Sequence, residues 1–166
     1  MKSLDETDRA IIAQLQYDGR KSYTDIAAEL GVSEASIRRR VKSLTDEGAL
    51  QVVGIVPPQF LDLSAAAMIG VRIEAGKIES AAATICDFPE VVYVFMSTGG
   101  FDLFIEVYCR DREHLVHFLN DKLQAVPGVI QTDTFMILKM YKLSYRWGEV
   151  EASHTINRPV SGGYQE

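Results

Sequence analysis

Residues 22–48, with the sequence SYTDIAAELGVSEASIRRRVKSLTDEG, predict two short helices joined by a tight turn. Ser22 and Asp25 form a pair resembling a capping box, and the apolar residues that follow recur at helical spacing for about two turns. In Gly31-Val32-Ser33, the glycine can adopt the left-handed conformation that ends a helix, the valine can fill the corner, and the serine can cap the next helix. That next helix is expected to continue until Gly48.

A further helix precedes this pair and completes a helix-turn-helix pattern. Asp5 and Asp8 can cap its start, apolar residues at helical spacing follow, and Asp18-Gly19 ends it. Two short helices joined by a glycine-containing turn, with a first helix behind them, are typical of a DNA-binding helix-turn-helix. Residues 1–49 are therefore expected to form this domain.

The second helix of the pair carries basic residues on the side opposite its apolar stripe. At about 100° per residue, Ile37, Val41 and Leu44 lie on one side of that helix. On the other side, small residues near the start allow close approach to the floor of a DNA major groove, and Arg39 can bind guanine through two hydrogen bonds. The flanking basic residues would reach phosphates. The expected DNA-binding residues are Ser33, Ala35, Ser36, Arg38, Arg39, Arg40, Lys42 and Ser43.

The charged residues of this domain also allow interpretations other than DNA binding. Glu34 suits the positive end of the helix dipole but would repel a phosphate, so it either accepts a hydrogen bond from a cytosine amino group or points away from DNA. The basic residues could also serve only solubility on a plain three-helix bundle. The whole chain has 17 basic and 23 acidic residues, a net charge of -6 and a pI near 5.1, which argues against coating nucleic acid by bulk charge.

Length and composition limit the class of protein. With 166 residues, 47% hydrophobic and 24% charged, the chain has the size of one domain or two small ones and enough apolar residues to fold. No stretch is long and apolar enough for a membrane-spanning helix, and charges interrupt the N-terminus before a signal sequence could form. We expect a cytoplasmic, nucleoid-associated protein whose two cysteines form no disulfide framework.

The rest of the chain contains a repeated strand-helix-strand pattern. Leu50–Val56 predicts a wing or hinge strand within a linker over residues 50–63. Phe88-Pro89-Glu90-Val91-Val92 and Val126-Pro127-Gly128-Val129-Ile130 occupy the same helix-to-strand junction in the two repeats. The repeats predict a ferredoxin-like α+β domain over residues 64–142, with both helices on one face of its sheet. The six expected elements are, in the order strand, helix, strand, strand, helix, strand, residues 67–74, 78–87, 91–97, 101–109, 112–125 and 129–141.

One face of that sheet is left uncovered by its own helices. Its strands are too apolar for two partly solvated faces, so we expect pairing with a second copy of the chain. A two-fold homodimer would also present two recognition helices to a palindromic DNA site. Residues 143–166 are expected to be a C-terminal tail that is polar and poorly packed from Gly148 onward. The apolar strand residues are Ile69, Val71, Ile73, Val92, Val94, Met96, Phe135, Ile137 and Met140.

These motifs resemble those of the leucine-responsive and asparagine-operon regulators, the Lrp/AsnC family of bacterial and archaeal transcription factors. The resemblance covers about residues 4–142 and implies a regulator that binds double-stranded DNA and assembles from dimers into tetramers or octamers. We expect no catalytic residue, cofactor or metal. The matching motifs are Leu4–Ile12, Asp18-Gly19-Arg20, Gly31-Val32-Ser33, Arg39–Leu44, Gly48, Ser97–Asp102, Pro127-Gly128-Val129, Thr132 and Thr134.

The resemblance also implies an effector site between adjacent dimers, commonly for an amino acid. The matching residues are Thr98, Gly99, Gly100, Phe101 and Asp102 in a loop, with Thr132 and Thr134 on a strand. Independently, Gly99 and Gly100 expose backbone N–H groups that suit a carboxylate, and Asp102 could hold an ammonium group. The alternative is a hairpin in which Gly-Gly makes the turn and Asp102 caps it.

Two departures from the family pattern leave base preference and effector open. Glu34-Ala35-Ser36 stands where many members have a proline and small hydroxyl residues, and Gly100 replaces a residue that is often polar. Competing functions are an architectural DNA-binding regulator without an effector, and an amino-acid-binding or RNA-binding module without operator specificity.

An enzyme is a further alternative. Its candidate cluster is Cys109 with His114 and His117. The two histidines are three residues apart on an expected helix, so they could also form half a metal site. The simpler interpretation is two surface histidines beside a buried cysteine.

Overall fold

The computed structural model describes residues 3–145, which separate into two compact units, one holding residues 3–55 and 142–145 and the other Val56–Tyr141. Of the tail expected over residues 143–166, all but the first three residues lie outside this description. Across residues 3–145, none of the helices has the length and apolar character needed to cross a membrane.

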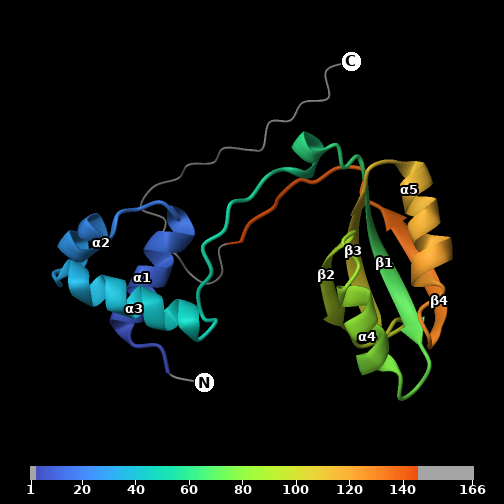
Figure 1. Ribbon diagram of the computed structural model, residues 1–166, viewed down its shortest axis with the longest axis horizontal. Helices are drawn as coiled ribbons and strands as arrows, with labels where there is room; N and C mark the ends of the chain where they lie inside the picture. The colour runs from blue at the N-terminus through green and yellow to red at the C-terminus, as the bar shows by residue number, and fades with distance from the viewer. Residues whose placement is uncertain (1–2, 146–166) are drawn as a thin grey trace. The chain divides into compact units, whose positions relative to one another are not determined.

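Three helices form the first unit (Figure 1). They are α1 (Glu6–Tyr17), α2 (Tyr23–Leu30) and α3 (Glu34–Asp46). The capping residues expected from the sequence start each of them: Asp5, Ser22 and Ser33 accept a hydrogen bond from the backbone N–H group three residues further on, at 2.8, 3.1 and 3.2 Å. Gly31 ends α2 with φ 66°, as predicted. Val32, however, is 36% exposed, so the expectation that it fills the corner was wrong.

The core of this unit lies between the three helices. Its buried residues are Ile11, Leu15, Ile26, Ala27, Ile37, Val41, Leu44 and Leu50. Beyond Leu50 the predicted wing strand was wrong, because residues 50–57 form no strand. Alternating apolar residues make a strand only where another strand offers its backbone groups, and the described residues provide none beside this segment. Val53 is accordingly 68% exposed.

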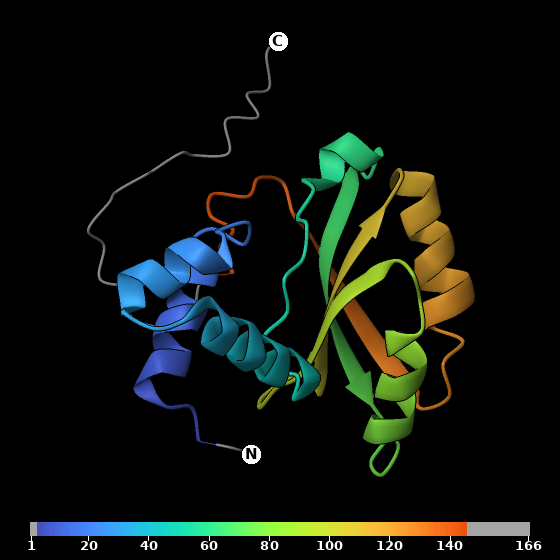
Figure 2. The ribbon, with the colours of Figure 1, turned by 60° about the vertical axis from the view of Figure 1, so that its left-hand side comes forward.

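The second unit has the ferredoxin-like architecture that the repeat predicted. Its four strands form one antiparallel sheet in the order β2-β3-β1-β4, with both helices on the same face (Figures 1 and 2). The short helical turn η1 (Pro58–Leu61) precedes it. The elements are β1 (Ala65–Ile73), α4 (Ile78–Cys86), β2 (Val91–Met96), β3 (Leu103–Cys109), α5 (Arg112–His117) and β4 (Val129–Met136).

Two of these elements end more than two residues before the predicted end. The helix expected over residues 112–125 changes its winding at Phe118, where a π-helical turn, η2 (Phe118–Leu123), continues α5. The strand expected over residues 129–141 ends at Met136. Its partner β1 begins at Ala65, so after Ile137 N–H donates to the Ala66 carbonyl at 2.9 Å there is no neighbouring strand to pair with.

The two faces of the sheet have different residues. Three of the apolar residues from which pairing with a second copy was expected are buried beneath the helices, together with the fully buried Phe118. They are Ile69, Val71 and Ile73. The opposite face, here called the open face, carries the alternate residues of each strand. They include Met68, Tyr93, Phe95, Phe104, Tyr108 and Phe135.

Aromatic rings form a continuous row on the open face. Tyr93 and Phe95 have ring centroids 5.7 Å apart, and Phe95 stacks on Phe104 at 5.6 Å with an interplanar angle of 20°. Phe101 continues the row, edge-on to Phe104 at 5.5 Å. These four residues are called the aromatic row below. Tyr93 is 55% and Phe95 39% exposed, so apolar surface remains in contact with solvent.

Candidate functional site

Two cations of α3 are paired with carboxylates of the same helix. Arg38 donates to Glu34 at 2.7 Å, and its guanidinium lies 5.4 Å from the centre of the Tyr23 ring. Lys42 donates to Asp46 at 2.6 Å. Because the side chains of Arg38 and Lys42 are 66% and 74% exposed, both remain accessible to a phosphate from solution.

Glu34 is engaged within the helix-turn-helix. Its Oε2 accepts a hydrogen bond from the Thr24 hydroxyl of α2 at 2.9 Å, and its Oε1 accepts the bond from Arg38. These hydrogen bonds, from Arg38 first and then Thr24, lower the pKa of Glu34. Of the two roles considered for this residue, contact with a base or orientation away from DNA, the geometry favours the second, since both carboxylate oxygens have partners in the protein.

Arg40 joins α3 to the start of α1. Its Nη1 donates to Asp5 and to Asp8, each at 2.7 Å, and Asp8 is buried. The backbone N–H of Asp8 and then the guanidinium lower the pKa of Asp5, while the hydrogen bonds to the two carboxylates raise the pKa of Arg40. A residue held in this way fixes the orientation of α3 and is less available to DNA than its exposed neighbours.

Arg39 is the unpaired basic residue of the predicted interface. It is exposed, and within residues 3–145 no carboxylate lies within ion-pair distance of it. Ala35, one helical turn earlier, is also exposed, which leaves room beside the helix for another molecule. An arginine without a partner retains all its donors for a base edge.

The three serines of the predicted interface have structural contacts. Ser33 caps α3 by accepting from the backbone N–H of Ser36, and the Ser43 hydroxyl donates to Glu47 at 2.7 Å. Ser36 and Ser43 are half-buried. The exposed set that the structure assembles on α3 is therefore Ala35, Arg38, Arg39 and Lys42.

In the second unit, the loop between β2 and β3 is fastened to the end of β1. The backbone N–H of Ile73 donates to Asp102 Oδ2 at 2.7 Å, and Asp102 N–H donates to the Val71 carbonyl at 3.0 Å. Gly99 has φ 119°, a conformation that favours glycine. One carboxylate oxygen of Asp102 thus has the capping role of the hairpin alternative. Thr98, Gly99 and Gly100 are exposed.

Arg72 of β1 contacts this loop, although it was not identified from the sequence as a site residue. From β1 its Nε and Nη2 donate to the Gly100 carbonyl at 3.3 and 3.0 Å. The exposed guanidinium therefore lies beside the two glycines that were expected to bind a carboxylate. The available signal was an arginine inside an otherwise apolar strand, which indicates a residue with a specific polar partner.

Phe101 lies on the open face of the sheet. A Cβ atom at Gly70 would come 2.7 Å from the Phe101 ring, so the missing side chain of Gly70 leaves the space that the ring occupies. Phe101 is consequently part of both the loop and the aromatic row.

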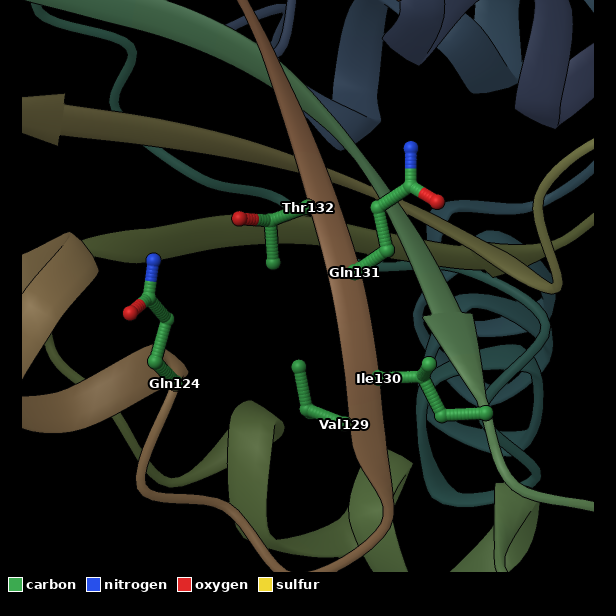
Figure 3. Close-up of a pocket in the computed structure, with 5 residues that line it drawn as sticks. All are labelled: Gln124, Val129, Ile130, Gln131 and Thr132. Atoms are coloured by element: carbon green, nitrogen blue, oxygen red, sulfur yellow. The ribbon is translucent and has the colours of Figure 1, made fainter.

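Thr132 and Thr134 lie on the other face. In β4 they are opposite Val71 and Ile69, whose side chains are buried beneath the helices. Cross-strand partners share a face, so these threonines lie on the opposite face of the sheet from Phe101. Thr132 instead lines a cavity of about 280 Å³ with Gln124, Val129, Ile130 and Gln131. In Figure 3, Gln124 and Thr132 lie on one side of the strand, and Ile130 and Gln131 lie on the other.

The two histidines of the candidate enzymatic cluster have different partners. His114 Nε2 is 3.0 Å from Glu90 Oε1, whereas His117 Nδ1 is 2.9 Å from Asp121. Burial, and then the charge of Glu90, raises the pKa of Cys109 to about 11, so its thiol is protonated at neutral pH. Residues 3–145 contain no group of three side chains that could hold a metal ion.

Known proteins match both units. Residues 4–45 match the family model of the AsnC-type helix-turn-helix domain, and residues 66–147 match that of the Lrp/AsnC ligand binding domain. The HTH-type transcriptional regulators FL11 of Pyrococcus horikoshii and Pyrococcus abyssi are 34% and 35% identical to this chain. Each alignment covers 84% of this chain, and 92% and 93% of the respective relative.

Solved structures also match this chain over most of its length. AsnC of E. coli, 29% identical, superimposes with a TM-score of 0.76 over 86% of this chain and 97% of its own. The transcriptional regulator NMB0573 of Neisseria meningitidis, solved as a complex with L-Met, is also 29% identical. Its TM-score is 0.77 over 88% of this chain and 97% of its own.

Proposed function

Because the chain belongs to the Lrp/AsnC family of transcriptional regulators, we propose that it binds palindromic double-stranded DNA as a homodimer and that an amino acid bound by its second unit alters this binding. The observation that carries the DNA-binding part is the exposed, unpaired Arg39 on α3, between Arg38 and Lys42. An unpaired arginine can read guanine with two hydrogen bonds, and the flanking cations can contact phosphates.

Substitution of Arg39 tests base recognition. Arg39→Ala is expected to weaken binding to a duplex selected from a random library by about 1–3 kcal/mol and to broaden sequence preference at one position per half-site. Lys42→Ala is expected to lower the affinity for selected and random duplexes alike and to reduce the salt dependence by about one phosphate contact. Fluorescence anisotropy titrations over a salt series measure both effects.

The control for these variants is Arg110→Ala, which removes an exposed arginine from the second unit. Its affinity for both duplexes should equal that of the wild type. If Arg39→Ala weakens selected and random DNA by the same factor, Arg39 contacts phosphates and not bases.

The proposed homodimer uses the open face of the sheet. The aromatic row, with Met68 and Phe135, presents an apolar surface of the kind that marks interfaces between proteins. The proposed partner on this face is a second copy of the chain. Two chains related by a two-fold axis present two α3 helices, one for each half of a palindromic site. We propose further association into tetramers or octamers.

The proposed effector site is centred on residues 98–102. Backbone N–H groups of Gly99 and Gly100, with the guanidinium of Arg72 beside them, suit the carboxylate of an amino acid. Thr132 and Thr134 lie on the opposite face from Phe101, so in this proposal they complete the site from a neighbouring chain. The L-Met complex of the Neisseria regulator supports an amino acid as the ligand.

A thermal-shift panel of the common amino acids, beginning with L-Met, tests the effector. A ligand that binds only the folded protein stabilises it by roughly 2.7 kcal/mol at a hundred times its Kd, so the midpoint should rise with concentration. Asp102→Asn keeps an oxygen that accepts from Ile73 N–H but removes the charge that would hold the ammonium group. This variant should keep its ligand-free midpoint and lose the shift. If no amino acid shifts the wild type, the protein is a regulator without an amino-acid effector.

A further inference from the structure

The two exposed ion pairs of α3 use the groups that a DNA phosphate would use. Glu34 accepts from Arg38 at 2.7 Å and Asp46 accepts from Lys42 at 2.6 Å, both four residues apart along the helix. Phosphate oxygens bind the same guanidinium and ammonium donors at similar distances. Each of these cations can therefore be held by a carboxylate of its own helix or by DNA.

The two carboxylates are positioned for this competition in different ways. The carboxylate of Glu34 accepts a hydrogen bond from the Thr24 hydroxyl at 2.9 Å, so the neighbouring helix α2 fixes its position. Asp46 lies at the other end of α3, and its side chain is 60% exposed. Arg39, between them, has no such carboxylate within residues 3–145.

We propose that Glu34 and Asp46 mask Arg38 and Lys42 in the DNA-free protein, so that phosphates have to displace them and the affinity for random DNA is held down. The inference rests on the proposed DNA-binding function of α3. Phosphate contacts supply nearly all of the binding to random sequence. The masking therefore restricts stable binding to sites where the unmasked Arg39 adds base contacts.

Neutral variants of the carboxylates test the masking. Glu34→Gln keeps an oxygen for Thr24, and Asp46→Asn keeps the size of the side chain. Each is expected to raise the affinity for a random-sequence duplex by about two- to fivefold, the range set by the strength of an exposed ion pair. Anisotropy titration of the full chain at low salt measures the change, and circular dichroism checks that the fold is kept.

Two controls separate masking from a change in overall charge. Glu29→Gln removes the same charge from the ion pair that Glu29 makes with Lys21 at 2.6 Å, outside α3, and should change the affinity less than Asp46→Asn does. In a Lys42→Gln background, Asp46→Asn should have no further effect, because the cation that it masks is gone. This second comparison does not depend on the Glu34 variant folding.

The outcomes are distinct. A gain for Asp46→Asn in the wild type that vanishes in the Lys42→Gln background supports masking. An equal gain in both backgrounds, or for Glu29→Gln, means that the carboxylate only repels DNA, and it overturns the inference while leaving the proposed function intact. A wild-type protein that binds neither random nor selected duplexes contradicts the proposed function itself and the inference with it.

Discussion

Phe95→Glu converts the proposed homodimer into a folded monomer. Phe95 stacks on Phe104 at 5.6 Å in the middle of the aromatic row, yet it is 39% exposed in the single chain. A carboxylate at this position is therefore solvated in the monomer and buried without a partner in the dimer. Loss of a central aromatic residue alone costs about 2 kcal/mol or more of binding, and the buried charge adds to this, so the dimer Kd should rise by at least roughly thirtyfold.

Sedimentation velocity over a range of concentrations measures this change, and circular dichroism checks the fold. Val116→Glu is the matched control, because Val116 is 50% exposed on α5, on the helix-covered side of the unit. It should dimerise like the wild type. If Phe95→Glu also remains a dimer, the open face is not the interface.

Phe118→Ala lowers the free energy of unfolding of the second unit by about 3–5 kcal/mol. Phe118 is fully buried beneath the sheet where the π-helical turn begins, and its ring meets that of Phe88 edge-on at 5.8 Å. Truncation removes the contacts of a whole ring and leaves a cavity that the surrounding residues fill only in part.

Hydrogen exchange of the β1 and β3 amides as a function of urea measures this loss within the second unit, without assuming that both units unfold together. Phe60→Ala is the control, since Phe60 is 75% exposed, and its effect should stay within about 0.5 kcal/mol. A Phe118 variant that matches the control would mean that the site repacks without a cavity.

Local signals in the sequence predicted much of the fold. A cap needs only a short polar side chain before a helical pattern, so Asp5, Ser22 and Ser33 could be assigned without tertiary information. Contacts between distant residues could not be assigned in this way. Arg40 was expected to bind DNA, but it pairs with Asp5 and Asp8, 35 and 32 residues earlier, and no local pattern indicates such a pair.

The faces of the sheet were harder to predict than its strands. Both alternating sets of residues in β1 and β3 contain apolar side chains, so periodicity did not tell which set the helices cover. Ile69, Val71 and Ile73 are in the core, and the open face is formed by their neighbours. The wing strand failed for a related reason: Leu50–Val56 has the composition of a strand, but pairing depends on another segment.

The position of Phe101 above Gly70 has a thermodynamic consequence. One ring belongs to the loop of residues 98–102 and to the surface proposed for dimerisation, so a displacement of that loop changes the surface. Linkage makes such a connection reciprocal. A ligand that tightened the association of two chains through this ring would itself be bound more tightly by the associated chains, by the same factor. Protein concentration and ligand concentration would then act as interchangeable signals.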